Sequence, residues 1–397
     1  WWREDPQVAR MRKAYDKLTF GVQERVVLDE DPGRPWWSSS PAGYPRDGVY
    51  PYGWEKSGDM HYWKVWHGRM PFENYLTIRP RFNSEFGFQA FPSLETLRTV
   101  VGPKDLNVSS PVMEHHQRSG IGNSVITETL TREFRFPADF GDFCYLSQVN
   151  QGMAMKIGIE HWRRIKPYCM GTLYWQFNDD WPVASWAGID WCLRWKALHY
   201  MARRFYAPLL GSVVDDEKNG LQLWATSDVA EPLSGTWQIE AWTYAGRRVW
   251  TRRGSFRLAE NESRAIATLP KDMLLDLGGG RAGVFLTTTV RAGRYVSPNT
   301  HFFGPLKWAD LPKSRIAVGI RPVKSARDGA AFELRLSSDA PAFHVELSTG
   351  KLGGRFSDNI FTLLPRRPVT VRFEPDLPTT VAALKKCLQV RSVRDTY

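Results

Sequence analysis

Residues 140–165 read FGDFCYLSQVNQGMAMKIGIEHWRRI, a stretch long and periodic enough to predict one continuous helix. It lies between two short aromatic segments that read as strands, RFNSEFGFQ at 81–89 and GTLYWQFNDDW at 171–181. A second helix is predicted at 194–206, RWKALHYMARRFY. The alternation of strand and helix is typical of a (β/α) barrel, where polar residues at strand ends carry the chemistry.

The residues before this stretch extend the same pattern. PQVARMRKAYDKLTFGVQERVVLDED at 6–31 predicts a helix that the turn DPGR closes, and RPWWSSSP at 34–41 predicts a short strand. DMHYWKVW at 59–66 predicts another strand. With about four strands in all, residues 1–208 are interpreted as the C-terminal half of a (β/α)8 TIM barrel.

After Ala207-Pro208 the sequence pattern changes to alternating apolar and polar residues, which is typical of strands, in runs separated by turn residues. Runs such as GLQLWATSD and GTWQIEAWTY predict a β-sandwich over 209–312. A second set, from RIAVGIRPVK to CLQVRSV, predicts a smaller β-sandwich over 313–397. The fold class is therefore α/β followed by all-β, with two immunoglobulin-like domains.

Composition and charge exclude several function classes. The formal net charge is +11, but the basic residues are scattered and form no nucleic-acid motif. No apolar run reaches the length of a membrane span. The cysteines, expected to be buried free thiols, show no metal-binding spacing, and the neighbours His115 and His116 lack a third ligand; the cysteines are Cys144, Cys169, Cys192 and Cys387. No cofactor is expected.

Glu85 is the carboxylate that deserves most weight as a catalytic candidate. Aromatic residues make up 13% of the chain, as is common in proteins that stack rings on sugars, although core packing explains many rings equally well. Glu85 lies among phenylalanines at a predicted strand end, and Gly87 follows it. Such a carboxylate is either a nucleophile kept ionised by its surroundings or a structural group paired with Arg79 or Arg81.

Several blocks, in order along the chain, resemble β-mannosidases of glycoside hydrolase family 2. They are GDMHYWKVWHG at 58–68, RFNSEFGFQAFP at 81–92, MEHHQRSGIGN at 113–123, LYWQFNDDWPVASWAGIDW at 173–191, RWKALHYMARRFYAP at 194–208, NTHFFGPLKWADLP at 299–312, RFSDNIFTLLP at 355–365 and VRSVRDTY at 390–397. The resemblance implies a retaining exo-β-glycosidase on a barrel followed by two sandwich domains. Its substrate would be terminal β-D-mannose of β-mannosides or manno-oligosaccharides.

The resemblance implies that Glu85 is the nucleophile and that the acid/base is a glutamate preceded by asparagine on an earlier strand. No such pair occurs in the chain before the first helix, and Glu4 and Asp5 are interpreted as part of the helical region that follows the acid's strand, so neither is assigned this role. The acid is therefore expected upstream of Trp1, and the chain alone is expected to be inactive without the N-terminal half of the same protein.

Other residues are assigned to the sugar site by the same resemblance. Trp175 matches the ring at the floor of the terminal subsite, the alternative being a barrel-core ring. Trp63 and His61 border the sugar, and strand alternation places Trp66 on the opposite face. Trp36 is expected to pack rather than to line the site.

Asn178, Asp179 and Trp37 are less determined. Asn178 and Asp179 either hold sugar hydroxyls or fix their loop, and Trp37 is expected to pack as Trp36 does.

Sugar selectivity is open, so another family 2 activity, such as β-galactosidase, β-glucuronidase or exo-β-glucosaminidase, is an alternative. A non-catalytic carbohydrate-binding or scaffold protein is the rival from another class. The oligomeric state is open, and the compartment is expected to be a bacterial cytoplasm or periplasm, or a lysosome in a eukaryote.

Overall fold

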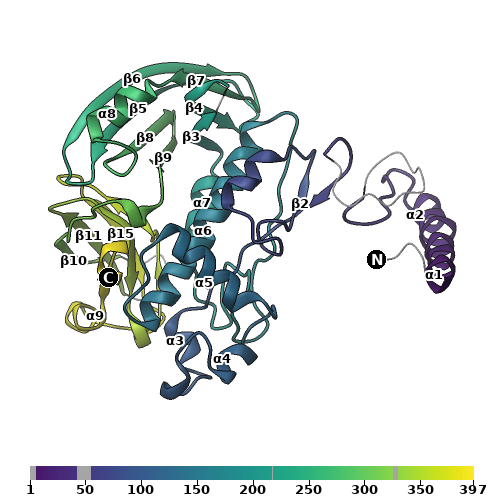
Figure 1. Cartoon of the computed structure of the whole chain (residues 1–397), viewed down its shortest axis with the longest axis horizontal. Helices are drawn as coiled ribbons and strands as arrows, with labels where there is room; N and C mark the ends of the chain where they lie inside the picture. Colours follow the sequence, from purple (N-terminus) through teal and green to yellow (C-terminus); the bar gives the residue numbers. More distant parts are fainter. Residues whose placement is uncertain (1–5, 43–54, 217, 325–329) are drawn as a thin grey trace.

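The computed structural model of the protein describes residues 6–42, 55–216, 218–324 and 330–397. Figure 1 shows a central helical region, two β-rich domains on one side of it and an N-terminal helix that lies apart on the other side. Glu4 and Asp5, which the sequence analysis does not assign as the acid/base, lie outside the described residues.

The N-terminal helix is continuous, as the sequence predicts. It consists of α1 (Pro6–Asp16), a π-helical segment (Lys17–Gln23) and α2 (Glu24–Glu30). The strand predicted at 34–41 is wrong, because these residues form no strand. Side-chain contacts replace a backbone ladder there, since Trp37 and Ser40 donate hydrogen bonds to the carboxylate of Asp59.

Two short parallel strands, β1 (Met60–His61) and β2 (Asn83–Glu85), form the frame of the candidate site. A third segment continues this parallel arrangement, because Asn83 forms a parallel bridge with Thr172. The strand predicted over 59–66 is too long. The chain turns after β1, where the amide of His67 donates to the carbonyl of Trp63 at 2.8 Å.

Helices surround these strands. The two predicted long helices are confirmed as α6 (Phe140–Arg164) and α7 (Ala197–Phe205). Helix α6 begins at an N-cap, where the side chain of Asp139 accepts from the amide of Asp142 at 2.8 Å. The shorter helices are η2 (Phe72–Thr77), α3 (Leu94–Leu97), η3 (Pro103–Asp105), α4 (Pro111–His115) and α5 (Gly122–Glu133).

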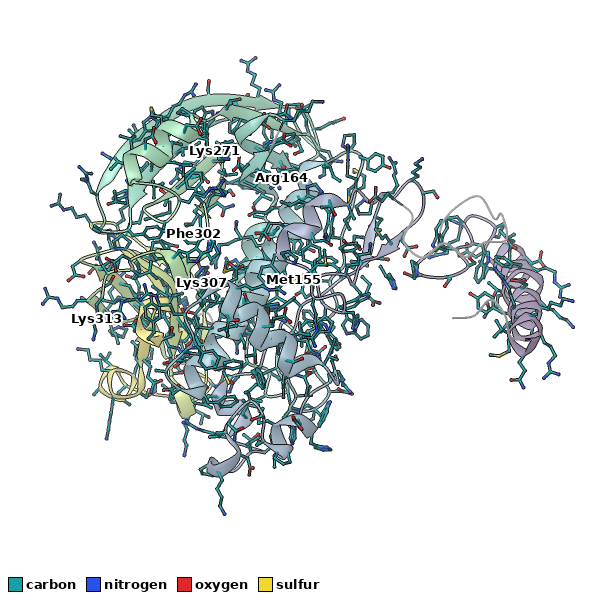
Figure 2. The ribbon with its side chains drawn as sticks, in the orientation of Figure 1. Met155, Arg164, Lys271, Phe302, Lys307 and Lys313 are labelled. Carbon is teal, nitrogen blue, oxygen red and sulfur yellow. The ribbon has the colours of Figure 1, made fainter. Side chains whose placement is uncertain are left out.

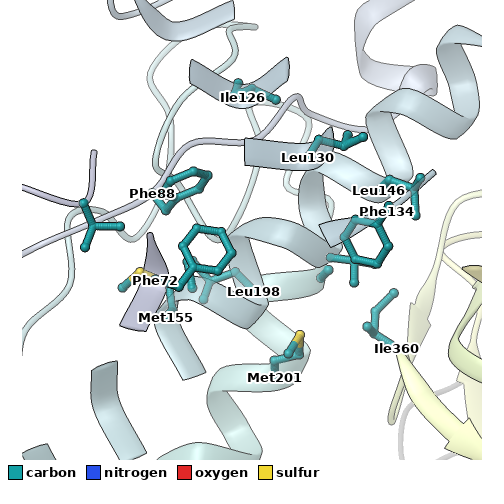
Figure 3. Packing of buried hydrophobic residues seen from close by; sticks show 14 of the residues in the cluster. Phe72, Phe88, Ile126, Leu130, Phe134, Leu146, Met155, Leu198, Met201 and Ile360 are labelled. Carbon is teal, nitrogen blue, oxygen red and sulfur yellow. The ribbon is translucent and has the colours of Figure 1, made fainter. Parts of the chain in front are cut away.

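The main hydrophobic core is shared by the helical region and both β-rich domains. Figure 3 shows part of this cluster, which includes Phe88 near β2, Met155 on α6 and Ile360 from the last domain. Trp162 on α6 is fully buried and packs edge-on against Phe86, with ring centroids 4.6 Å apart. The core therefore links the segment after Glu85 directly to α6.

The first β-rich domain is a sandwich of two antiparallel sheets, ordered β3-β4-β7 and β6-β5-β8-β9. A helix that the sequence pattern did not reveal, α8 (Lys271–Gly278), buries Leu274 completely against them. The strands are β3 (Leu209–Asp216), β4 (Gly220–Ser227), β5 (Leu233–Thr243), β6 (Arg248–Leu258), β7 (Ser263–Thr268), β8 (Val284–Ala292) and β9 (Tyr295–Phe302), and η4 (Leu306–Trp308) follows.

The second β-rich domain has sheets ordered β10-β11-β15-β13 and β14-β12-β16. Its helix α9 (Val381–Cys387) was not predicted either. The strands are β10 (Ile316–Lys324), β11 (Ala330–Ser338), β12 (Ala342–Ser348), β13 (Arg355–Phe356), β14 (Phe361–Leu363), β15 (Val369–Glu374) and β16 (Gln389–Arg391), with η5 (Gly350–Leu352) and η6 (Val393–Thr396).

Two sequence-level expectations concern single residues and membrane spans. All four cysteines are free, and Cys144 and Cys169 are buried as expected. Cys192 is exposed and Cys387 is only partly buried, so the expectation is wrong for Cys192. Within the described ranges, no helix combines the length and the apolar character that crossing a membrane requires.

Glu240 on β5 joins the two β-rich domains through an ion pair. Its carboxylate, 3% exposed, accepts from Arg248 of β6 at 2.9 Å and from Arg367 of the last domain at 2.5 Å. Glu240 and the two arginines line a cavity of about 720 Å³ on the outer face of the sheet. Burial acts to raise the pKa of Glu240, but the hydrogen bonds and charges of the two arginines outweigh it and lower the pKa.

We expect Glu240→Gln to lower the free energy of unfolding by about 1–3 kcal/mol at neutral pH, the range for losing hydrogen bonds to a charged group. Because the pKa is lowered in the folded protein, this stabilisation is present above the ordinary glutamate pKa of about 4.3 and is lost as the pH falls further. The difference in melting temperature between the two proteins should therefore shrink below about pH 4. Glu333→Gln, which breaks the more exposed pair with Arg321, is the control and should change stability little.

Candidate active site

Backbone hydrogen bonds place Glu85 at the end of the middle one of three parallel segments. The amide of Tyr62 donates to the carbonyl of Glu85 at 2.8 Å on one side. On the other side, Leu173 donates to Asn83 at 2.9 Å and Trp175 donates to Phe86 at 2.9 Å. Side chains at the ends of neighbouring parallel segments therefore gather around Glu85.

Two side chains from the β1 segment approach the carboxylate of Glu85. The indole Nε1 of Trp63 donates to Oε1 at 2.9 Å, and the Nδ1 atom of His61 lies 3.7 Å from Oε2. The side chain of Glu85 remains 27% exposed. It thus faces solvent while a neutral N–H group and a titratable ring orient it.

The alternative of an arginine-paired structural carboxylate is wrong for Glu85. The guanidinium groups of Arg79 and Arg81 lie over the ring of Tyr168, at 5.4 and 4.8 Å from its centre. Among the described residues, the ion-pair contact of Glu85 is with His61. In the described part of the chain, no guanidinium group therefore holds the carboxylate of Glu85 in an ion pair.

Trp175 pairs its backbone amide with the carbonyl of Phe86, the residue after Glu85, at 2.9 Å, and 46% of its surface is exposed in this chain. Gly87 permits this placement. A Cβ atom at Gly87 would fall 2.3 Å from the carbonyl oxygen of Trp175 and 3.3 Å from the ring of Trp63. The glycine is therefore required by the close approach of two backbone segments and an aromatic side chain.

The tryptophans next to the site form a packed series. Trp63 packs edge-on against Trp186, and Trp186 packs in the same way against Trp66, at centroid distances of 5.8 and 5.7 Å. Trp66 is fully buried, and its indole N–H finds no hydrogen-bond partner in the described part of the chain. It lies in the turn after β1, so the prediction that it shares a strand with Trp63 is wrong.

Asp179 and Asn178 lie in the loop that follows Trp175. Asp179 is 5% exposed, and its carboxylate accepts from the hydroxyl of Ser185 at 2.7 Å. Burial raises the pKa of Asp179, although Lys196 and Ser185 oppose this effect, and burial lowers the pKa of Lys196 to about 8. Asn178 is exposed, and its side-chain amide donates to the backbone carbonyl of Asp179 at 3.3 Å. Both side chains thus make contacts that organise the loop.

The sequence analysis missed Asp59, Ser40 and Ser84. They form a hydrogen-bonded group that contacts the Nε2 side of the His61 ring through Ser40. The only signal was the position of Asp59 two residues before His61. Trp37, expected to pack, is 46% exposed and donates to Asp59 at 3.3 Å.

The neighbouring histidines lie away from these contacts. The rings of His115 and His116 pack against Trp181, and Nδ1 of His116 contacts the carbonyl of Pro182 at 2.5 Å. Within the described ranges, no group of three or more His, Cys, Asp and Glu side chains is arranged to hold a metal ion.

Comparisons with known proteins support a relationship over almost the whole chain. Residues 219–307 match a mannosidase Ig/CBM-like domain, and residues 312–396 match an Ig-fold domain of mannosidases. The β-mannosidase of Capra hircus is 32% identical over 96% of this chain and 46% of its own length, and that of Mus musculus is 30% identical over 100% and 47%. The chain spans about half the length of the curated relatives it matches.

Solved structures extend the comparison. The β-D-mannosidase of Dictyoglomus thermophilum covers 99% of this chain with a TM-score of 0.85 and 28% identity, and the match covers 46% of that protein. The exo-chitosanase of Amycolatopsis orientalis shares the fold, with a TM-score of 0.65 and 17% identity over 86% of this chain and 44% of its own.

We expect Gly87→Ala to destabilise the protein by about 1–3 kcal/mol, because the added methyl group overlaps the Trp175 carbonyl and overpacks the site. The measurement is the free energy of unfolding from denaturant titration. Gly120→Ala is the matched control, since a Cβ there meets nothing within 4 Å. Equal stability of the two variants would show that the Gly87 segment has room to move.

Proposed function

We propose, from the premise that this chain belongs to the β-mannosidase family, that it supplies the nucleophile-bearing part of a retaining exo-β-mannosidase. The substrate would be terminal, non-reducing β-D-mannose of β-mannosides or manno-oligosaccharides. The observation that carries the proposal is the carboxylate of Glu85, partly exposed and oriented by Trp63 and His61 with no arginine or lysine paired to it in the described part of the chain.

Glu85 would act as the nucleophile of a double displacement. Its carboxylate oxygen attacks the anomeric carbon while the bond to the leaving oxygen breaks, and a second carboxyl group donates a proton to that oxygen. Water then attacks the glycosyl ester, gives its proton to the second group and releases mannose with its configuration retained. Retention requires the two carboxyl groups to lie about 5–5.5 Å apart.

Asp59, the carboxylate next to this group of residues, is a poor candidate for the proton donor. It accepts hydrogen bonds from two serine hydroxyls, an indole and a backbone amide. Burial favours a higher pKa, but these bonds outweigh it and the pKa of Asp59 is lowered. A group that must donate a proton needs a raised pKa, so the acid is proposed to precede Trp1.

The three parallel segments are proposed to be adjacent strands of a (β/α)8 barrel whose other strands belong to the same full-length protein. The exposed face of the N-terminal helix supports this proposal. Met11, Tyr15, Leu18 and Val22 follow helical spacing on one face and are 61%, 40%, 52% and 41% exposed. Such an apolar stripe requires a covering surface, which the remaining half of the relatives' length would supply.

Trp175 is proposed as the platform beneath the terminal sugar, because its backbone pairs with Phe86, the residue after Glu85, and its side chain is exposed and could cover an apolar sugar face. Trp63 and His61 would then border the sugar and direct the carboxylate. Asn178, which is exposed, is the better candidate for a hydroxyl contact, and buried Asp179 is proposed to hold the loop.

A 2-deoxy-2-fluoro mannoside with a good leaving group should label Glu85 covalently in the full-length protein. The fluorine destabilises the oxocarbenium-like transition state and slows hydrolysis of the intermediate most. Mass mapping of peptides should place the label on RFNSEFGFQ, and Glu85→Ala should abolish turnover, with partial rescue by azide.

A label on Glu55, Glu73 or Glu114, or an inverted product anomer, would contradict the assignment of Glu85. A protein that binds mannosides but neither turns them over nor takes the label would instead be the non-catalytic binder. Comparison of aryl β-mannosides with β-galactosides, β-glucuronides and β-glucosaminides would decide the sugar.

We expect Trp63→Phe to lower kcat/KM by about 10- to 100-fold, the scale of one hydrogen bond to a charged group. The change keeps an aromatic ring but removes the indole N–H that orients Glu85. Trp66→Phe is a matched control, because the indole N–H of Trp66 has no partner among the described residues. It should lower stability through the cavity it leaves and keep kcat/KM within about threefold. Equal kinetic losses in both variants would argue for general packing damage.

A further inference from the structure

A group of hydrogen-bonded side chains around Asp59 has no role in the proposed reaction. The Oδ2 atom of Asp59 accepts from the hydroxyls of Ser40 and Ser84, each at 2.5 Å. Its Oδ1 atom accepts from the amide of Ala42 at 2.8 Å and from the indole of Trp37 at 3.3 Å. Four donors thus converge on one carboxylate, three from residues 37–42 and one from Ser84.

Asp59 acts only as an acceptor in this group. Burial alone would raise its pKa, but the four hydrogen bonds outweigh burial and keep the pKa below the ordinary aspartate value. An ionised carboxylate has no proton to donate. The contacts of Ser40 and Ser84 with Asp59, at 2.5 Å each, are much shorter than the 3.3 Å contacts of Ser40 with Ser84 and of Ser84 with the carbonyl of Met60, so the single hydroxyl proton of each serine is used on Asp59.

The proton count fixes the protonation of His61. The hydroxyl oxygen of Ser40 lies 3.2 Å from Nε2 of His61. Because Ser40 has already given its proton to Asp59, it can only accept here, and Nε2 must carry the proton. The Nδ1 atom then has a lone pair whenever the ring is neutral.

This tautomer has a consequence at Glu85. The Nδ1 atom of His61 faces Oε2 of Glu85 at 3.7 Å. A neutral ring with its proton on Nε2 presents a lone pair to the carboxylate, whereas an imidazolium presents a positive N–H. The titratable groups that face the ring are Glu85 on β2 and, through Ser40, Asp59. In the described part of the chain no lysine or arginine pairs with either carboxylate.

We infer that Asp59 is a positioning residue that acts through Ser40 to keep the ring proton of His61 on Nε2. The interaction between His61 and the nucleophile is thereby present only when the ring is charged. The inference rests on the proposed function for its catalytic meaning, but the tautomer itself is a property of the free protein.

The test is the tautomer of His61 in the full-length protein labelled with ¹⁵N-histidine, with His61→Gln used to assign the signals. At a pH where the ring is neutral, the unmodified protein should show a protonated Nε2 and an unprotonated Nδ1. Ser40→Ala removes the acceptor of the Nε2 proton and should shift the proton to Nδ1, where Glu85 can accept it. Ser40→Thr keeps the hydroxyl and should restore the original tautomer.

Asp59→Asn provides an independent variant. Its amide can donate to the oxygen of Ser40, which frees the hydroxyl proton of Ser40 for Nε2 and should likewise move the ring proton to Nδ1. Asp190→Asn is the matched control, because Asp190 also accepts from hydroxyls, those of Ser93 at 3.2 Å and Thr96 at 2.7 Å, and should leave the His61 signals unchanged.

An Nδ1-protonated ring in the unmodified protein, or an unchanged Nε2 proton in both Ser40→Ala and Asp59→Asn, would overturn the inference. The outcome is separable from that of the proposed function. If the fluoro-sugar labels Glu85 while the tautomer is unaffected, only the positioning role fails. If Glu85 takes no label but the tautomer shifts as expected, the proposed nucleophile fails and the Asp59–Ser40–His61 linkage stands.

Discussion

The side chain of Gln151, buried in the middle of α6, is the contact on which the geometry around Glu85 depends. Its amide donates to the carbonyls of Phe88 at 2.8 Å and Trp186 at 3.0 Å. One residue thereby fixes the segment that follows Glu85 and the segment that carries the tryptophan next to Trp63. If the buried amide of Gln151 lost these partners, the desolvation penalty would exceed the net stabilisation that the hydrogen bonds provide. The positions of the two segments relative to α6 are therefore strongly specified.

Helix α6 is in turn held at its C-terminal end by the first β-rich domain. Arg163 donates to Asp228 at 2.9 Å, and Arg164 donates to the hydroxyl of Ser212 at 3.2 Å. Figure 2 shows Met155 near the middle of this helix and Arg164 where it meets that domain. The two arginines stabilise α6 through these hydrogen bonds and also through their positive charge, which complements the negative end of the helix dipole. The first β-rich domain therefore stabilises the C-terminal end of the helix whose Gln151 contacts the segment after Glu85.

The sequence predicts the parts of this structure that follow a regular period. The helix at 140–164 and the sandwich strands belong to this class, since burial of one face imposes the pattern. The strand from Asp59 to Trp66 was overestimated because aromatic and β-branched residues, which are typical of strands, continue past His61 into the turn. The contact of Ser40 with Asp59 left no pattern, since two residues 19 positions apart meet through the fold alone. The role of Glu85 was inferred from resemblance, and its contacts with Trp63 and His61 required coordinates.

The absence of an arginine from the contacts of Glu85 in the described part of the chain fits the proposed chemistry better than a permanent ion pair would. In the proposed mechanism the carboxylate would become a glycosyl ester and lose its negative charge, and a partly buried arginine beside it would be left as an unpaired cation. The Coulomb attraction that such a pair loses is about 4 kcal/mol at 4 Å and an effective dielectric constant of 20. The indole of Trp63 carries no charge, so it would not impose this penalty on the intermediate. A neutral donor would thus allow the proposed site to hold both the ionised and the esterified states of Glu85.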